Sequence, residues 1–216
     1  MDRAVHLRPG WGFALSMSSS RIYNYESINS ENLHGWFQGD GMTYLYNSDV
    51  GQFSDDFWPT VDPYRLPGTT VDTTPRTNAS GQSYLSSKNW VGGATLFTNG
   101  AAGMELDAYN SPLTAKKSWF MFDDEVVCLG AGITCTNSAD IETAAVNRKL
   151  SPGNTNVFVV DGVTMPTALG WQTNRPNTTW CALGGLGGCY FPGGTTINVL
   201  RQARTNSWSQ INSGGT

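Results

Sequence analysis

The sequence predicts an all-β fold made of short antiparallel strands. Apolar stretches recur between turn residues along the whole chain, whereas a helical pattern of apolar residues is nearly absent. The 216 residues include 25 glycines and 10 prolines, and aromatic residues make up 12%. Because glycine and proline favour turns and aromatic residues favour strands, this composition indicates many turns and few long helices.

The strand pattern can be followed in chain order. The stretch 117–130 carries WFMF, then the acidic DDE, then VVCL, which predicts two antiparallel strands joined by a turn. The glycines that follow, Gly130 and Gly132, predict a further return of the chain, so the strands form a meander. We expect strands at 11–17, 42–47, 90–97, 102–109, 117–130, 157–163, 189–191 and 196–203.

Other segments lack a strand pattern. The segment from Asp49 to Thr74 contains three prolines and no periodicity, which predicts a long irregular excursion of the kind that is often functional or ligand-facing. The polar stretch 74–87 is expected to be exposed. The one helix candidate is short and runs from Ser138 to Asn147.

Charge and length restrict the class of protein. A chain of this length can form one domain with a sizeable core. Charged residues make up only 14% and the net charge is −4, which argues against nucleic acid as a partner. No run of roughly 18 apolar residues is present, so we expect no membrane span. The N-terminal MDRAVHLRPGW lacks the apolar region of a secretory signal, so we expect a cytoplasmic protein or a piece of a longer one.

The four cysteines form two local pairs. Cys128 and Cys135 flank LGAGIT, and Cys181 and Cys189 flank ALGGLGG. Either glycine-rich stretch could turn a hairpin that brings its two thiols together. Free thiols behaving as small hydrophobes are the equally weighted alternative, since connectivity does not follow from sequence.

The motifs of common enzymes are missing. The chain has two histidines and no Gly-x-Ser-x-Gly, P-loop or Cys-x-x-Cys, so hydrolase triads and zinc sites are poorly supported. Polar residues concentrate between residues 16 and 46, where carboxylates and amides alternate with Tyr and Trp. That mixture suits a sugar, whose hydroxyls need donors and acceptors and whose ring faces need aromatic surfaces. A polar loop packed by its own hydrogen bonds is the competing interpretation, and composition alone favours it.

Several long stretches resemble polysaccharide lyase family 8, which contains bacterial hyaluronate, chondroitin AC and xanthan lyases. The resemblance rests on MDRAVHLRPGWGFALSMSSSRIYNYESINSENLHGWFQGDGMTYLYN and DDFWPTVDPYRLPGTTVD, and then on KSWFMFDDEVVCLGAGIT, ETAAVNRKL, GGCYFPGG and LRQARTNSWSQIN. It covers nearly the whole chain in order.

The resemblance implies a fold and a larger protein. Residues 1–216 would be the first large part of a central antiparallel β-sandwich, a supersandwich like that of galactose mutarotase, left incomplete at its C-terminus. Family members are secreted or surface-exposed and also contain an N-terminal α/α toroid and a C-terminal β-domain, both absent here. Met1 matches a methionine that the family carries internally, so we expect a piece of a longer, extracellular protein.

The resemblance also implies an activity and its residues. The family cleaves uronic-acid polysaccharides by β-elimination, with its Asn, His and Tyr supplied by the toroid and no cofactor. The central domain would contribute Glu26 and Asn29 in supporting roles, and we expect both on an exposed, concave edge of the sheet. Arg21 and Asn32 are the candidate substrate contacts. The partners would be an acidic polysaccharide and the toroid, and the alternative function is a non-catalytic carbohydrate-binding module.

Other candidate residues receive a structural interpretation. Asp55, Asp56, Asp62 and Asp72 are spaced unlike any EF-hand loop, so we expect no metal site. Phe57, Trp58 and Tyr64 could form a sugar platform, but aromatic residues beside proline more often anchor a loop in a small core. His34 is likewise expected to be structural.

Overall fold

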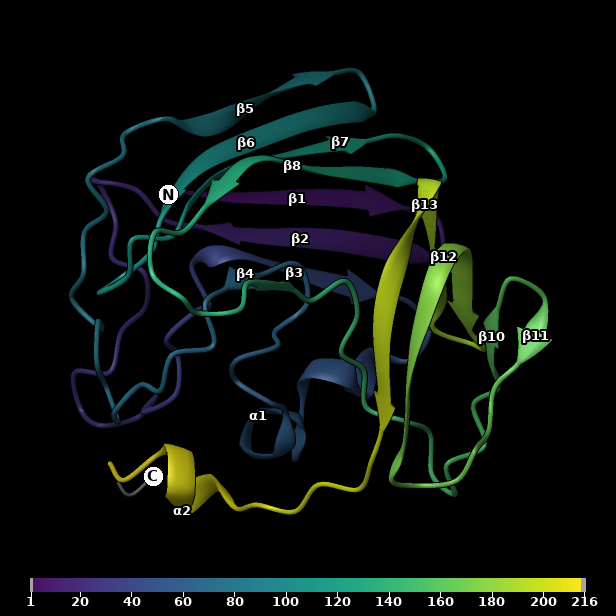
Figure 1. The fold of residues 1–216 in the computed structure, drawn as a ribbon. Coiled ribbons are helices and arrows are strands. Elements are labelled where there is room, and N and C mark those ends of the chain that lie inside the picture. The colour runs from purple at the N-terminus through teal and green to yellow at the C-terminus, as the bar shows by residue number, and fades with distance from the viewer. Residues whose placement is uncertain (1, 215–216) are drawn as a thin grey trace.

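The computed structural model describes residues 2–214, and two of its sheets form the centre of the molecule (Figure 1). Every strand pairing within these sheets is antiparallel. The first sheet has the order β1 (Arg3–Arg8), β2 (Trp11–Met17) and β3 (Asp40–Tyr46). The second has the order β5 (Val91–Leu96), β6 (Asn99–Asp107), β7 (Thr114–Met121) and β8 (Val126–Thr134).

The main core lies between these two sheets. Alternate residues of β2, β6 and β7 point inward, because successive side chains on a strand face opposite sides. Leu15 from the first sheet and Met104 and Trp119 from the second belong to one buried cluster. The prediction of an antiparallel sandwich is therefore confirmed.

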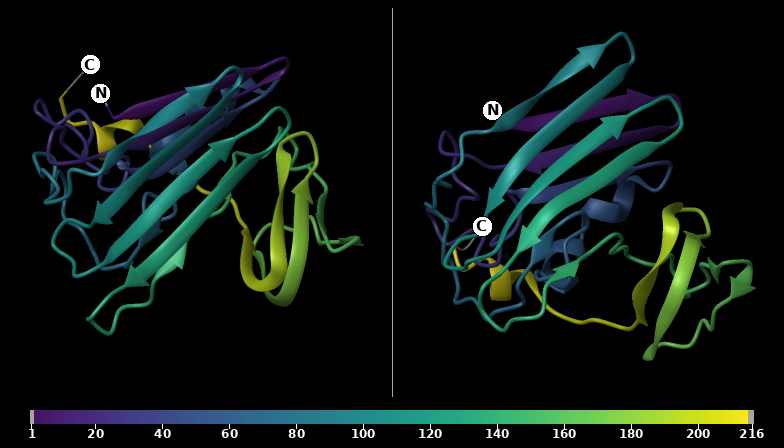
Figure 2. Two further views of the ribbon diagram at one scale, coloured as in Figure 1. Left: turned by 90° about the horizontal axis from the view of Figure 1, so that it is seen from above. Right: turned by 45° about the horizontal axis from the view of Figure 1, so that its top comes forward.

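A third sheet stands to one side of this sandwich (Figures 1 and 2). Its order is β11 (Val163–Thr164), β10 (Phe158–Val160), β12 (Trp171–Leu183) and β13 (Gly187–Arg201). A small cluster centred on Val160, Met165 and Cys181 holds it together. Most residues of β12 and β13 are exposed or half-buried, so this sheet depends largely on its own hydrogen bonds.

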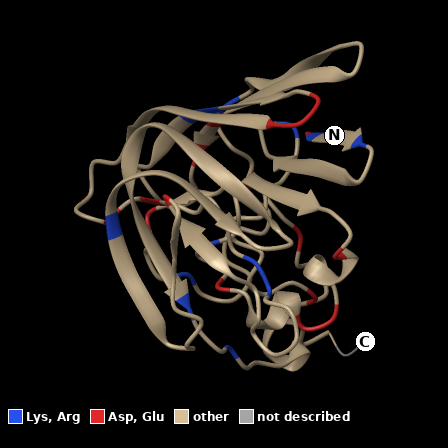
Figure 3. Cartoon of the chain, turned by 90° about the vertical axis from the view of Figure 1, so that its right-hand side faces the viewer, with Lys and Arg blue, Asp and Glu red and all other residues tan. Residues whose placement is uncertain are grey.

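The remaining elements are short. β4 (Thr70–Val71) pairs with β9 (Glu142–Thr143), and the helices among the described residues are single turns: η1 (Val50–Phe53), α1 (Phe57–Thr60) and α2 (Trp208–Ile211). No helix within residues 2–214 is long and apolar enough to cross a membrane. The positions of charged residues are scattered along the chain (Figure 3).

The helix predicted from Ser138 to Asn147 is wrong. This segment is extended, and Glu142 and Thr143 form β9 against β4. Two side-chain contacts fix it there, since Glu142 binds Arg65 at 2.7 Å and the hydroxyls of Thr143 and Thr70 are 3.0 Å apart. A segment this short has little helix propensity of its own, so these tertiary contacts decide its conformation.

The return of the chain predicted at Gly130 and Gly132, which could have paired Cys128 with Cys135, is also wrong. Gly130 and Ala131 continue β8 and pair with Lys117 and Lys116 of β7, so LGAGIT runs on as a strand. Seven extended residues span about 23 Å, far beyond the reach of a disulfide. The other glycine-rich stretch does turn, and it joins β12 to β13. All four cysteines are free thiols in the structure.

Candidate functional site

The candidate site residues lie on the long loop 18–39 between β2 and β3. The loop is closed at its base by Asn24, which is buried. The Asn24 amide donates to the carbonyl oxygen of Trp36 at 2.6 Å, and its side-chain oxygen accepts from the Gly39 N–H at 2.8 Å. A Cβ at Gly39 would lie 2.4 Å from Asn24, so only glycine permits this closure.

Glu26 and Asn29 are both exposed, as expected. Their expected position on a sheet edge is wrong, because the segment from 23 to 39 contains no strand. The Asn29 amide lies 3.5 Å from a carboxylate oxygen of Glu31. Within residues 2–214 no positively charged side chain forms an ion pair with Glu26. The loop therefore presents an uncompensated carboxylate to solvent.

The tip of the loop is fixed by the C-terminal segment. The Ser213 N–H donates to the Ser30 carbonyl oxygen at 2.8 Å, and the Leu33 N–H donates to the Ile211 carbonyl oxygen at 2.8 Å. Ser30 adopts a φ of 59°, a left-handed conformation that the surrounding contacts must hold in place. Glu26 and Asn29 are thus carried on a loop with a defined shape.

Arg21 and Asn32 occupy different environments. The Arg21 guanidinium donates to the carbonyl oxygens of Asn89 and Val91 at 2.8 and 3.3 Å and pairs with Asp2 at 3.4 Å. It therefore holds the start of β5 against the N-terminus. Asn32 donates to the Gln38 side-chain oxygen at 2.9 Å, and both residues line a pocket.

That pocket has a volume of about 690 Å³ and is built from three separate segments. They are the loop 31–38, the region 58–66 around α1, and the C-terminal segment 202–211. Four aromatic side chains line it: Trp36, Trp58, Tyr64 and Trp208. Its polar lining includes Glu31, Asn32, His34, Gln38, Gln202, Arg204 and Asn206. Aromatic faces beside amides, a carboxylate and a guanidinium suit a sugar ligand.

A second buried cluster supports the aromatic wall of the pocket. Phe57 belongs to this cluster, which confirms its structural interpretation, while Trp58 and Tyr64 pack against the cluster and also line the pocket. Trp36 and Tyr64 have ring centroids 5.2 Å apart. The aromatic surfaces facing the pocket are therefore held by packing from behind.

His34 also lines the pocket. Its ring lies 4.6 Å from the Trp36 ring, centroid to centroid, and its Nε2 is 3.0 Å from the Asn78 side-chain oxygen. Both contacts hold the ring in place, in agreement with a structural role, although its position leaves it beside any ligand of the pocket.

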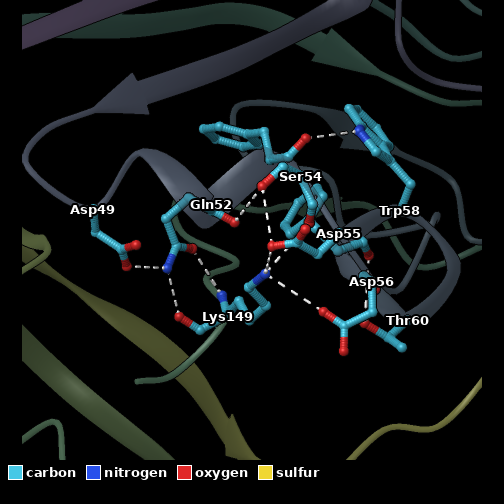
Figure 4. Close-up of polar contacts among 11 residues, drawn as sticks. Asp49, Gln52, Ser54, Asp55, Asp56, Trp58, Thr60 and Lys149 are labelled. Carbon is cyan, nitrogen blue, oxygen red and sulfur yellow. Dashed lines mark hydrogen bonds and ion pairs between the residues drawn. The ribbon is translucent and has the colours of Figure 1, made fainter. Parts of the chain in front are cut away.

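Residues 49–60, the first part of the irregular segment 49–74, are held in place by a network of polar contacts around Gln52 and Lys149 (Figure 4). The Gln52 amide donates to Asp49 and to the Lys149 carbonyl oxygen, both at 2.7 Å, and accepts from the Lys149 N–H at 3.0 Å. The Trp58 indole N–H donates to the Phe53 carbonyl oxygen at 3.1 Å. This network fixes α1 and hence the position of Trp58 in the pocket.

The four aspartates considered as metal ligands do not converge. Asp55 and Asp56 lie beside Lys149, Asp62 pairs with Arg65, and Asp72 pairs with Arg76. Among the described residues no three His, Cys, Asp or Glu side chains are grouped to hold a metal ion. Each of these carboxylates instead lies beside a lysine or arginine side chain.

Comparisons with known proteins place this chain in a family. The family model described as "Polysaccharide lyase family 8, super-sandwich domain" matches residues 1–216. The chain belongs to polysaccharide lyase family 8. It is 46% identical to a hyaluronate lyase of Thermasporomyces composti, over 100% of the chain and 28% of that protein. It is 48% identical to a xanthan lyase of Bacillus sp. (strain GL1), over 98% of the chain and 23% of that protein.

Solved structures of the family have the same fold. A Paenibacillus xanthan lyase superposes with a TM-score of 0.93 at 53% identity, covering 100% of this chain and 21% of that one. The Streptomyces coelicolor A3 chondroitin AC lyase, solved in complex with chondroitin sulphate, superposes with a TM-score of 0.86 at 42% identity and covers 100% and 28%. The chain thus spans about a quarter of the length of these lyases.

Sequence reasoning missed the contribution of the C-terminal segment. Gln202, Arg204 and Trp208 line the pocket, but they lie far from loop 18–39 in the sequence. The one local signal was Trp208, an aromatic residue within the polar stretch 202–210. That stretch has no other large apolar residue against which Trp208 could pack.

Proposed function

We propose that the chain is the central β-sandwich domain of a longer, extracellular lyase that cleaves uronic-acid-containing polysaccharides by β-elimination. This domain forms one wall of the substrate cleft, and an N-terminal α/α toroid forms the other. The proposal is supported by the chain's membership of polysaccharide lyase family 8 and by relatives named hyaluronate, xanthan and chondroitin AC lyases.

The observation that carries the proposal is the continuity between Asn29 and the pocket. Asn29 contacts Glu31, and Glu31 lines the pocket. A sugar chain seated on Trp58 and Trp208 would therefore extend toward the exposed side chains of Asn29 and Glu26. Because both are exposed and the loop beneath them is fixed, they are available to groups on an opposing domain.

The chemistry explains why a second domain is required. In β-elimination a base removes the C5 proton of the uronic acid, the C4–O bond breaks and a C4–C5 double bond forms. The carboxylate next to C5 must be neutralised as the proton leaves. Glu26 is itself anionic and cannot do this, so its proposed role is to position a cationic Arg or His from the toroid.

A non-catalytic carbohydrate-binding module is the second candidate function. The aromatic and polar lining of the pocket supports it, since the pocket lies entirely within this chain. The two functions differ in whether the domain acts with a toroid or alone.

One experiment separates them. The purified 216-residue chain and a version extended to the length of its relatives are incubated with hyaluronan, chondroitin and xanthan. The unsaturated product is followed by its ultraviolet absorbance. We expect activity in the extended protein and none in the 216-residue chain. Sugar binding by an extended protein that never forms unsaturated product would favour the binding module, whereas activity of the short chain would overturn the division of roles.

A further inference from the structure

Cys181 of β12 and Cys189 of β13 are directly opposed across an antiparallel hairpin. The turn that joins the two strands is tight, because the Leu186 N–H donates to the Leu183 carbonyl oxygen at 3.0 Å and Gly187 follows at a φ of 131°. Only glycine adopts that φ without strain. The turn therefore sets the register that places the two cysteines opposite each other.

Opposed positions in an antiparallel pair have the spacing that a disulfide needs. Their Cα atoms lie about 4.5 to 5.5 Å apart, and disulfides form at Cα separations of about 4.4 to 6.8 Å. In addition, opposed residues of an antiparallel pair face the same side of the sheet, and Cys189 packs against the buried cluster that contains Cys181. A bond between the two Sγ atoms requires no movement of the strands.

The two thiols also differ in chemical character. The neighbouring Cys189 thiol lowers the pKa of Cys181, whereas the Cys181 thiol and burial raise the pKa of Cys189. Because the thiolate is the reactive form, the first thiol of the pair to ionise can react and its neighbour can react after it. Cys181 is buried and Cys189 is half-buried, so solutes reach the pair from the side of Cys189.

We propose that Cys181 and Cys189 are a redox-active dithiol that closes to a disulfide across the β12–β13 hairpin. The oxidant is a low-molecular-weight disulfide, RSSR. The thiolate of one of the two cysteines attacks one sulfur of RSSR, which forms a mixed disulfide and releases RS⁻. The other cysteine then loses its proton and attacks the Sγ of the first, which forms the protein disulfide and releases the second RS⁻. The two protein thiols are oxidised, and RSSR is reduced to two RSH.

The position of the bond gives it a structural effect. The third sheet has only a small core, and β12 and β13 change register between Arg175 and Thr178 and again between Thr178 and Trp180. Strands with few buried side chains specify their register weakly. A covalent link at Cys181 and Cys189 fixes the register next to the turn, which opposes slippage along the rest of the hairpin.

The test uses thiol counting and peptide mapping on the folded chain. The protein is fully reduced, freed of reductant, and equilibrated with mixtures of reduced and oxidised glutathione. Remaining thiols are then alkylated under denaturing conditions. We expect the four free thiols of the reduced chain to fall to two. A non-reducing digest should contain one linked pair of peptides, carrying Cys181 and Cys189.

Matched variants make the result specific. The double variant Cys128→Ser/Cys135→Ser keeps the proposed pair and should lose its two remaining thiols in the same glutathione mixtures as the parent chain. Cys181→Ser and Cys189→Ser cannot form the protein disulfide, and a mixed disulfide on the remaining cysteine of the pair should be revealed by the added mass of glutathione. Four thiols that persist in every mixture, or a linked peptide containing Cys128 or Cys135, would overturn the proposal. The measurement on the parent chain needs no variant to fold.

Discussion

The ammonium group of Lys117 donates to the backbone carbonyl oxygen of Asp40 at 3.2 Å and also to that of Gly68. Lys117 lies in β7 and Asp40 begins β3 immediately after the loop 18–39, so the bond connects the two layers of the sandwich where that loop ends. Both side chains are buried. Burial raises the pKa of Asp40 to about 7, an effect that Lys117 and Arg76 oppose, and burial lowers the pKa of Lys117 to about 8.

The first prediction concerns the pH dependence of stability. The pKa of Asp40 is higher in the folded than in the unfolded chain, so protonation of Asp40 stabilises the folded chain. This stabilisation is complete below about pH 4 and is lost as the pH rises through about 7. Asp40→Asn cannot titrate. Denaturant unfolding should therefore show that, between pH 4 and pH 7, the free energy of unfolding of the parent chain falls by at least about 1 kcal/mol relative to that of the variant. Parallel stability curves would contradict this assignment.

The second prediction concerns the ion pair beneath the site. Asp72 and Arg76 are 3.2 Å apart, with side chains only 1% and 4% exposed. Removing one partner of a buried pair leaves an uncompensated charge, so Arg76→Met should lower the free energy of unfolding by about 3 to 5 kcal/mol. Arg65→Met is the control, because Arg65 forms its ion pairs at the surface, where such pairs contribute about 0 to 1 kcal/mol. Equal losses in the two variants would show that burial is not the cause.

The third prediction concerns the pocket. Trp208→Ala removes an aromatic face from the lining and should weaken binding of a chondroitin oligosaccharide about two- to thirteenfold, if stacking on a sugar is worth as much as an aromatic pair, about 0.5 to 1.5 kcal/mol. Trp90→Ala is the matched control, because Trp90 is similarly exposed but lies outside the pocket. Titration calorimetry of both variants measures the difference. If the two lose affinity equally, the pocket is not the binding site.

The fourth prediction concerns Glu26 in the full-length enzyme. If its carboxylate positions a catalytic cation, Glu26→Gln removes one charge-assisted hydrogen bond, worth about 1.5 to 3 kcal/mol, and should lower kcat roughly ten- to a hundredfold. KM should change little, because the lost interaction acts in the transition state. Steady-state kinetics together with the thermal midpoint of the variant test this. A tenfold higher KM at unchanged kcat would make Glu26 a substrate contact.

The sandwich and the family can both be predicted from the amino-acid sequence. The alternation in β2, β6 and β7 is a local pattern with a period of two, and such a pattern fixes both the strand and the face that it buries. β12 was not predicted, because most of its residues are exposed and its sequence lacks the alternation of apolar and polar residues that identifies a strand. Exposure of Glu26 and Asn29 also followed from their polar surroundings.

The contacts between residues that are distant in the sequence become visible only in the folded chain. The pocket joins residues near 34, 58 and 204, and no local pattern records their closeness. The two cysteine pairs show the physical reason most simply. Both flank glycines, yet Cys128 and Cys135 are separated because β8 continues through Gly130, paired with Lys117 of β7, whereas the stretch before Cys189 turns back on itself. A glycine permits a turn, but pairing with a neighbouring strand determines whether the chain makes one.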